Sequence, residues 1–211
     1  MSVTRRFVVK ICGVTTPEDA KAAVEAGADA IGINLWPKSK RYADDAAARA
    51  VVDAIPPGVL KVGVFVNAPA ADVAARVATL GLDRAQLHGD ETPAEFAALP
   101  SRQLVRVVRV RDEASFAGAD GWDAPLFLYD ALVDGYGGAG VTAPWALIER
   151  LARRPFLLAG GLTPENVAAA IAATRPDGVD VASGVESAPG RKDPERVRRF
   201  IQAARDAFAK L

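Results

Sequence analysis

Short apolar runs alternate with alanine-rich, charged stretches along almost the whole chain. Each apolar run is rich in Val, Ile or Leu and ends near a polar residue or a glycine, a pattern typical of a buried β-strand. Eight such runs predict strands at residues 8–11, 30–35, 61–66, 84–87, 104–110, 126–129, 156–159 and 178–181.

The alanine-rich stretches carry their apolar residues at helical spacing. They predict helices at residues 17–26, 44–54, 70–80, 93–99, 145–151, 164–173 and 194–208, and a weakly helical segment at 113–122. Three of the helices follow a Thr-Pro pair, at Thr16-Pro17, Thr92-Pro93 and Thr163-Pro164. Such a pair is typical of a helix start, because the hydroxyl caps the helix and proline fits its first position.

Regular alternation of strands and helices predicts parallel strands joined by helical crossovers. Eight strand-helix units are the number that closes a (β/α)8 barrel, the TIM barrel. We therefore expect this barrel, with an open doubly wound sheet as the second choice. The chain has 211 residues, half of them hydrophobic, and no linker divides it, so we predict one domain over residues 1–211.

Charge and cysteine content exclude several functional classes. Lys plus Arg equals Asp plus Glu, at 26 each, so no net field attracts nucleic acid or an anionic membrane. The single cysteine excludes an internal disulfide, and one Cys with one His leaves little for a zinc site. Lys10 interrupts the apolar run 7–9 too early for a signal peptide, and no segment is long enough to span a bilayer. We expect a cytoplasmic protein.

Glycines gather in the loops after the last three predicted strands. They include Gly138 after the sixth strand, Gly160 and Gly161 after the seventh, and Gly184 after the eighth. Glycine lets backbone N–H groups approach an anion, and these loops form the usual phosphate site of eight-stranded barrels. One Gly-Gly pair alone would indicate a tight turn, but three neighbouring loops favour a phosphorylated small molecule as the substrate.

Four further residues have two interpretations each. Cys12 ends the first apolar run: it is either a small buried hydrophobe or a reactive thiol. Asp130 follows the apolar run 126–129 and is either a loop cap or a general acid. Arg41 lies in the basic loop 38–41 and is either solvated or able to grip a substrate carboxylate. His88 pairs with the cysteine or is structural, and no Gly-x-Ser-x-Gly elbow supports a serine hydrolase.

Six segments, in chain order, resemble the signature segments of phosphoribosylanthranilate isomerases. They are KICGVT at 10–15, KSKRY at 38–42, VGVFVN at 62–67, QLHGDE at 86–91, AGGLTPENV at 159–167 and VDVASGVE at 179–186. The resemblance spans nearly the whole chain. It implies a (β/α)8 barrel of tryptophan biosynthesis that needs no cofactor and no metal. The implied reaction is an Amadori rearrangement of N-(5-phosphoribosyl)anthranilate to 1-(2-carboxyphenylamino)-1-deoxyribulose 5-phosphate.

The resemblance also implies residue roles. Cys12 corresponds to the general base, Asp130 to the general acid and Arg41 to the residue that holds the anthranilate carboxylate. The other implied substrate-binding residues are Gly138, Gly160, Gly161, Asp180, Ser183 and Gly184. The expected assembly is a monomer or a homodimer, with the phosphorylated small molecule as its partner.

Some positions depart from the family pattern, and other functions stay open. Ala182 stands where a second serine is frequent, Tyr129 stands where an aliphatic residue is usual, and residues 33–35 replace a more apolar run. An isomerase of histidine biosynthesis or a dual-substrate enzyme would carry aspartate at position 12. A metal-dependent phosphosugar epimerase would need several histidines. A silent phosphosugar-binding protein would need neither Cys12 nor Asp130.

Overall fold

A computed structural model describes residues 8–131, 144–153 and 155–211. Eight parallel strands follow one another in chain order and close into a barrel, because β1 pairs with both β2 and β8. They are β1 (Val8–Cys12), β2 (Ala30–Asn34), β3 (Leu60–Phe65), β4 (Arg84–Leu87), β5 (Leu104–Val110), β6 (Leu126–Ala131), β7 (Phe156–Leu158) and β8 (Gly178–Val181). The predicted (β/α)8 barrel is confirmed, and the open sheet is wrong.

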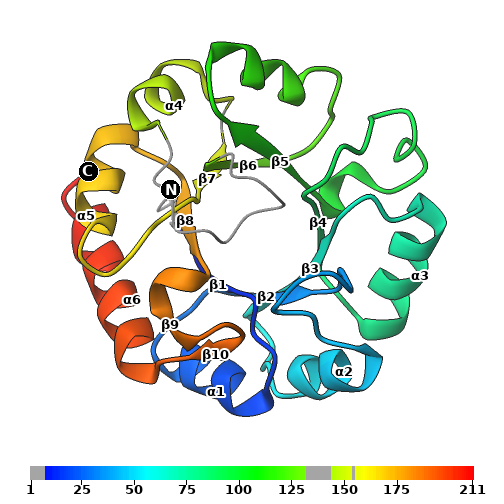
Figure 1. Cartoon of the computed structure of the whole chain (residues 1–211), viewed down its shortest axis with the longest axis horizontal. Helices are drawn as coiled ribbons and strands as arrows, with labels where there is room; N and C mark the ends of the chain where they lie inside the picture. The colour runs from blue at the N-terminus through cyan, green and yellow to red at the C-terminus, as the bar shows by residue number, and fades with distance from the viewer. Residues whose placement is uncertain (1–7, 132–143, 154) are drawn as a thin grey trace, which may run out of the picture.

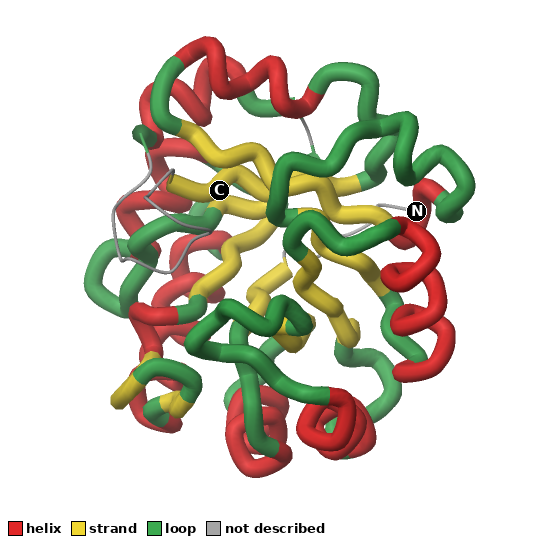
Figure 2. Tube along the Cα trace, turned by 45° about the vertical axis from the view of Figure 1, so that its right-hand side comes forward, coloured by secondary structure: helices red, strands yellow, loops and turns green. Residues whose placement is uncertain are grey.

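Helices surround the ring of strands, as the view down the barrel shows (Figure 1). They are α1 (Pro17–Glu25), α2 (Asp45–Asp53), α3 (Ala70–Leu80), α4 (Trp145–Leu151), α5 (Val167–Thr174) and α6 (Pro194–Phe208). Figure 2 shows the same two layers from another side, with the strands enclosed by helices and loops. None of the helices in the described part of the chain is both long and apolar enough to cross a membrane.

The predicted helix at 93–99 is wrong, because this segment forms turns followed by the short 3-10 helix η1 (Ser101–Gln103). Its backbone bonds link residues three apart, from Phe96 N to the Pro93 carbonyl and from Leu99 N to the Phe96 carbonyl. Only seven residues separate Thr92 from Pro100. A segment this short does not offset the free energy of nucleating an α-helix unless tertiary packing supports it.

The helix predicted from residue 164 begins later, at Val167. In the turn before it, the Asn166 side chain accepts a hydrogen bond from Thr163 N at 2.8 Å and donates one to the Gly161 carbonyl at 2.9 Å. These bonds tie the loop after β7 to the start of α5.

Three short elements have no counterpart in the prediction. The 3-10 helix η3 (Ser183–Val185) follows β8, and the antiparallel pair β9 (Glu186–Ala188) and β10 (Arg191–Lys192) comes next. Figure 1 shows this hairpin over the α1 side of the barrel, and Lys192 N donates to the Asp19 carboxylate of α1. The weakly helical segment 113–122 forms the 3-10 helix η2 (Glu113–Ala119).

Apolar residues form two clusters on opposite faces of the strands. The larger cluster fills the space between strands and helices. The smaller contains no helical residue and lies inside the barrel: it consists of Val105, Val107, Leu128, Leu157 and Ala159, with Val8 and Leu126 packed against it. Because side chains alternate along a strand, residues an even number of positions from these also face the interior.

Tyr129 belongs to the outer cluster and faces away from the barrel interior. It is fully buried, its ring stacks on Phe116 and meets Phe156 edge-on, and its hydroxyl accepts a hydrogen bond from Arg153 N at 2.8 Å. The unusual aromatic residue before Asp130 therefore packs under η2 rather than in the barrel mouth.

Tyr129→Phe is expected to lower the free energy of unfolding by about 1 kcal/mol, because it leaves the Arg153 N–H without its acceptor. Tyr129→Ala is expected to cost about 3–5 kcal/mol, because it also leaves a cavity among the aromatic rings. Urea unfolding of both variants beside the wild type measures these differences. Equal stability of the Phe variant and the wild type would contradict the role of the hydroxyl.

Candidate functional site

Cys12 is the last residue of β1 and lies at the carboxyl end of the barrel, as predicted. It shares its face with Val8 of the interior cluster, and it is 8% exposed. Its neighbour on the adjacent strand β2 is Gly32. A Cβ atom at Gly32 would lie 2.7 Å from the Cys12 sulfur. The absence of a side chain at Gly32 therefore makes room for the thiol.

Lys10 and Asp180 lie directly beneath Cys12, inside the barrel. They are opposite each other on β1 and β8, and Lys10 Nζ bonds to Asp180 Oδ1 at 2.9 Å. Burial by itself lowers the pKa of Lys10, but the Asp180 carboxylate and the Cys12 sulfur together raise it above its ordinary value. Lys10 therefore carries a positive charge at neutral pH.

The thiol of Cys12 is affected by several charges. Burial and the negative charge of Asp180 raise its pKa above the ordinary value, while Lys10, through charge and a hydrogen bond, and Lys192 act in the opposite direction. In the ligand-free protein, the thiol form consequently persists to higher pH than in a free cysteine.

Asp130 and His88 form a second polar cluster at the same end of the barrel. Asp130 lies within β6, whose strand extends one residue beyond it, and it faces the interior with Leu126 and Leu128. His88 follows β4, and its Nε2 lies 3.4 Å from Asp130 Oδ2. The sequence had left the role of His88 open, and the structure places it beside the predicted acid.

Gln86 lies beside His88, with its amide nitrogen 3.3 Å from His88 Nδ1. An amide N–H donated to Nδ1 goes with the ring tautomer whose proton lies on Nε2, facing the Asp130 carboxylate. The His88–Asp130 contact is longer than an ordinary hydrogen bond, and a small movement of either side chain would close it.

Arg41 lies in the loop after β2 and is held by Glu186 of β9. Its Nε and Nη2 atoms each donate to one Glu186 oxygen at 2.7 Å, and Lys192 Nζ donates to the same carboxylate at 2.9 Å. Burial would raise the pKa of Glu186, but these two cations lower it below its ordinary value. This bidentate pair fixes the plane of the guanidinium and leaves its other N–H groups for a further anion.

The side chain of Arg41 also rests on Gly13, the residue after Cys12. Gly13 has a φ of +71°, and a Cβ atom there would lie 2.5 Å from Arg41 Cδ. Glycine is thus required both by the backbone conformation and by the close approach of Arg41. The contact places the predicted carboxylate-binding residue next to the predicted base.

The loops after β7 and β8 touch each other at the barrel mouth. Gly160 and Gly161 adopt positive φ angles of 90° and 63°. A Cβ atom at Gly184 would lie 1.9 Å from the Leu162 carbonyl oxygen, so the two loops are in direct contact. Ser183 begins η3 in the second loop. Gly138, the other predicted residue, lies outside the described residues.

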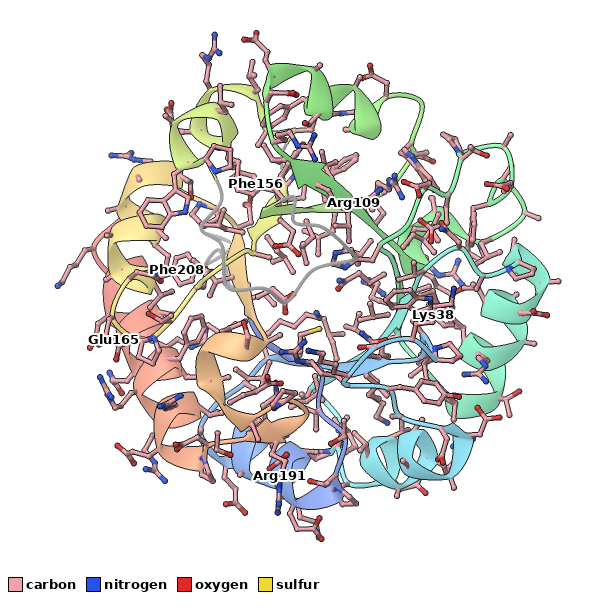
Figure 3. All side chains as sticks on the ribbon, viewed as in Figure 1. Lys38, Arg109, Phe156, Glu165, Arg191 and Phe208 are labelled. Atoms are coloured by element: carbon pink, nitrogen blue, oxygen red, sulfur yellow. The ribbon has the colours of Figure 1, made fainter. Side chains whose placement is uncertain are left out.

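The QLHGDE segment has a structural part as well. Glu91 accepts hydrogen bonds from Asn67 N and Gly89 N, both at 2.8 Å, and pairs with Arg106 Nη1 at 3.0 Å. It therefore ties the segments that follow β3 and β4 to β5. Figure 3 shows Arg109 on the ring of strands, while Glu165 and Arg191 lie on the outer rim.

Sequence reasoning overlooked Lys10, Glu186 and Lys192 as parts of the site. Lys10 gave one clue, because a lysine inside the run Val8-Val9-Lys10-Ile11 is unusual for a buried strand and requires a partner. Glu186 and Lys192 gave none, because their hairpin is too short to show a strand pattern.

Glu186→Ala is expected to lower the free energy of unfolding by about 3 kcal/mol, because it leaves Arg41 and the buried Lys192 without their shared anion. The matched control is Glu165→Ala, which removes an exposed pair with Arg199 and is expected to leave the unfolding midpoint nearly unchanged. Urea unfolding measures both, and equal midpoints for the two variants would contradict the importance of the buried cluster.

Residues 9–203 match the family model described as N-(5'phosphoribosyl)anthranilate (PRA) isomerase. The N-(5'-phosphoribosyl)anthranilate isomerase of Myxococcus xanthus is 48% identical over 204 residues, which cover 93% of this chain and 95% of that protein. The enzyme of the same name from Rubrobacter xylanophilus is 46% identical over 202 residues, covering 93% and 98%.

Solved structures are similar over the same range. Phosphoribosyl anthranilate isomerase from Thermotoga maritima superimposes with a TM-score of 0.89 at 40% identity, covering 95% of this chain and 100% of that one. A further structure of this kind was solved in complex with reduced 1-(o-carboxyphenylamino)-1-deoxyribulose 5-phosphate. It superimposes with a TM-score of 0.84 at 37% identity, with the same coverage.

Proposed function

The chain belongs to the N-(5'-phosphoribosyl)anthranilate isomerase family, and from this premise we propose how its residues act in tryptophan biosynthesis. The enzyme is an isomerase. The proposed reaction is an Amadori rearrangement of N-(5-phosphoribosyl)anthranilate to 1-(2-carboxyphenylamino)-1-deoxyribulose 5-phosphate. It moves protons within one molecule and is redox-neutral.

The first step assigns Asp130 as the general acid. Its carboxylic acid gives a proton to the furanose oxygen, the C1–O bond breaks, and the anilino nitrogen forms a Schiff base with C1. The resulting Asp130 carboxylate faces His88 Nε2 at 3.4 Å, and this N–H is placed to stabilise the new negative charge.

The second step assigns Cys12 as the general base. Its thiolate takes the proton from C2, and the electrons of the broken C–H bond form the C1–C2 double bond of an enolamine while the nitrogen becomes neutral. Tautomerisation of the enolamine to the ketone completes the product. Each proton-transfer group is worth roughly a hundredfold or more in rate.

The substrate has an anionic group at each end, and the protein binds it by these two groups. Arg41, oriented by Glu186, binds the anthranilate carboxylate. The phosphate lies at the loops of Gly160, Gly161, Ser183 and Gly184, together with Gly138. Asp180 forms an ion pair with Lys10. The expected contact of Asp180 with the substrate stays a prediction.

The observation that carries this proposal is the arrangement of Cys12 and Asp130. Both face the interior at the carboxyl end of the barrel, where this fold places its active sites, and each has its own polar neighbours. A single isomerase domain over residues 1–211, a monomer or homodimer, and a cytoplasmic location stay predictions.

Cys12→Ala and Asp130→Asn are each expected to lower kcat by about a hundredfold or more, because each removes one proton-transfer group. Turnover of phosphoribosylanthranilate by purified protein measures the loss. Asp72→Asn, on the exposed face of α3, is the matched control and is expected to retain wild-type turnover. A folded wild type without turnover would contradict the isomerase assignment.

The kcat/KM of the wild type is expected to rise with pH through the alkaline range. The pKa of the Cys12 thiol is raised, so its thiolate, the basic form, accumulates above the ordinary thiol pKa of about 8.5. A pH profile of kcat/KM checks this. The residual activity of Cys12→Ala is expected to lose the rising limb, and a limb that persists in this variant would assign it to another group.

A further inference from the structure

Lys10 is a charged residue inside an otherwise mostly apolar barrel. It is 2% exposed, and Val8 of the same strand packs against the interior cluster of Val and Leu side chains. Burying an ammonium group costs several kcal/mol unless it is paired and hydrogen-bonded. The proposed mechanism so far gives Lys10 no task, although it lies directly beneath the proposed base.

The contacts of Lys10 join two acidic groups. Its Nζ bonds to Asp180 Oδ1 at 2.9 Å, and Cys12 lies two residues further along the same face of β1. The Cys12 sulfur and Lys10 Nζ both border the space that a side chain at position 32 would fill. A Cβ atom on Gly32 would lie 2.7 Å from the sulfur and 3.0 Å from Nζ. An ammonium group has three donors, so it can serve both partners at once.

Other charged groups reach the sulfur less directly. Lys192 of β10 and Arg41 of the loop after β2 interact with Cys12 by charge, and both are bound to Glu186. Asp180 of β8 is the acidic group acting on the thiol, and it is bound to Lys10. Of the two buried lysines near Cys12, Lys10 shares its strand face with the thiol, whereas Lys192 is bound to Glu186.

We propose that Lys10 is a positioning residue that holds the Cys12 thiolate by a charge-assisted hydrogen bond, with Asp180 fixing the ammonium group from the other side. This inference rests on the proposed function, in which Cys12 is the base. The ammonium group counteracts the burial that disfavours the thiolate. When the sulfur takes the C2 proton, Lys10 keeps its own proton and its bond to Asp180.

The single cysteine of the chain allows a direct test. Thiolate absorbance near 240 nm, followed against pH, reports the titration of Cys12 alone, with the Cys12→Ser variant as the blank. In Lys10→Met the pKa of the thiol is expected to rise by about one unit or more, and kcat at neutral pH to fall about tenfold or more with little change in KM.

The matched control is Lys192→Met, which removes a buried, ion-paired lysine that acts on the sulfur by charge alone. Its effect on the thiol pKa is expected to be clearly smaller than that of Lys10→Met. A Lys10→Met thiol that titrates like the wild type, or no higher than that of Lys192→Met, would overturn the proposal.

Asp180→Asn provides an independent arm if Lys10→Met does not fold. With Asp180 neutral, the thiolate is left as the anion facing Lys10, so the thiol pKa is expected to fall below that of the wild type. A rise would overturn the proposal. Because the titration needs no substrate, a shifted thiol with unchanged kcat in Lys10→Met would refute Cys12 as the base and leave its contact with Lys10 standing.

Discussion

The buried ion pair between Lys10 and Asp180 links the two strands that close the barrel and lies beneath the proposed base of its site. The two residues are opposite each other on β1 and β8, the strands that close the barrel. Loss of one partner of a buried pair costs about 3–5 kcal/mol, a large part of the net stability of a domain. The same ammonium group lies beneath Cys12, on the same face of β1. One buried charge therefore links the first and last strands and, in our proposal, holds the Cys12 thiolate.

A second cluster of buried, paired charges lies at the rim of the barrel. Arg41, Glu186 and Lys192 come from three different segments, and Lys192 Nζ also donates to the Ala182 carbonyl at 3.1 Å. These bonds hold the β9–β10 hairpin over the barrel, so the hairpin contributes charge rather than apolar area. A guanidinium fixed before a carboxylate arrives loses less conformational entropy on binding. Ala182 thus contributes its backbone carbonyl to this cluster.

The sequence allowed most of the fold to be predicted, because its strands and most helices follow local patterns. The bounds of β4, β5, β8, α3 and α6 agree with the predicted ranges. The helix predicted at 93–99 is wrong, and the helix predicted at 164–173 begins three residues later, at Val167. The site was predictable only where a residue sits at a strand end, as Cys12 and Asp130 do. Lys10 and Asp180 are 170 positions apart, so no local pattern could have joined them.

The two proposed proton-transfer groups lie in different surroundings. Cys12 adjoins a fixed ammonium group on the β1–β8 side of the barrel, whereas Asp130 adjoins a histidine on the β4–β6 side. Gln86 keeps His88 in the form that faces Asp130 with its N–H, and Asp180 keeps Lys10 charged beneath Cys12. Each proposed catalytic group is thus governed by a neighbour that is itself fixed by a further hydrogen bond.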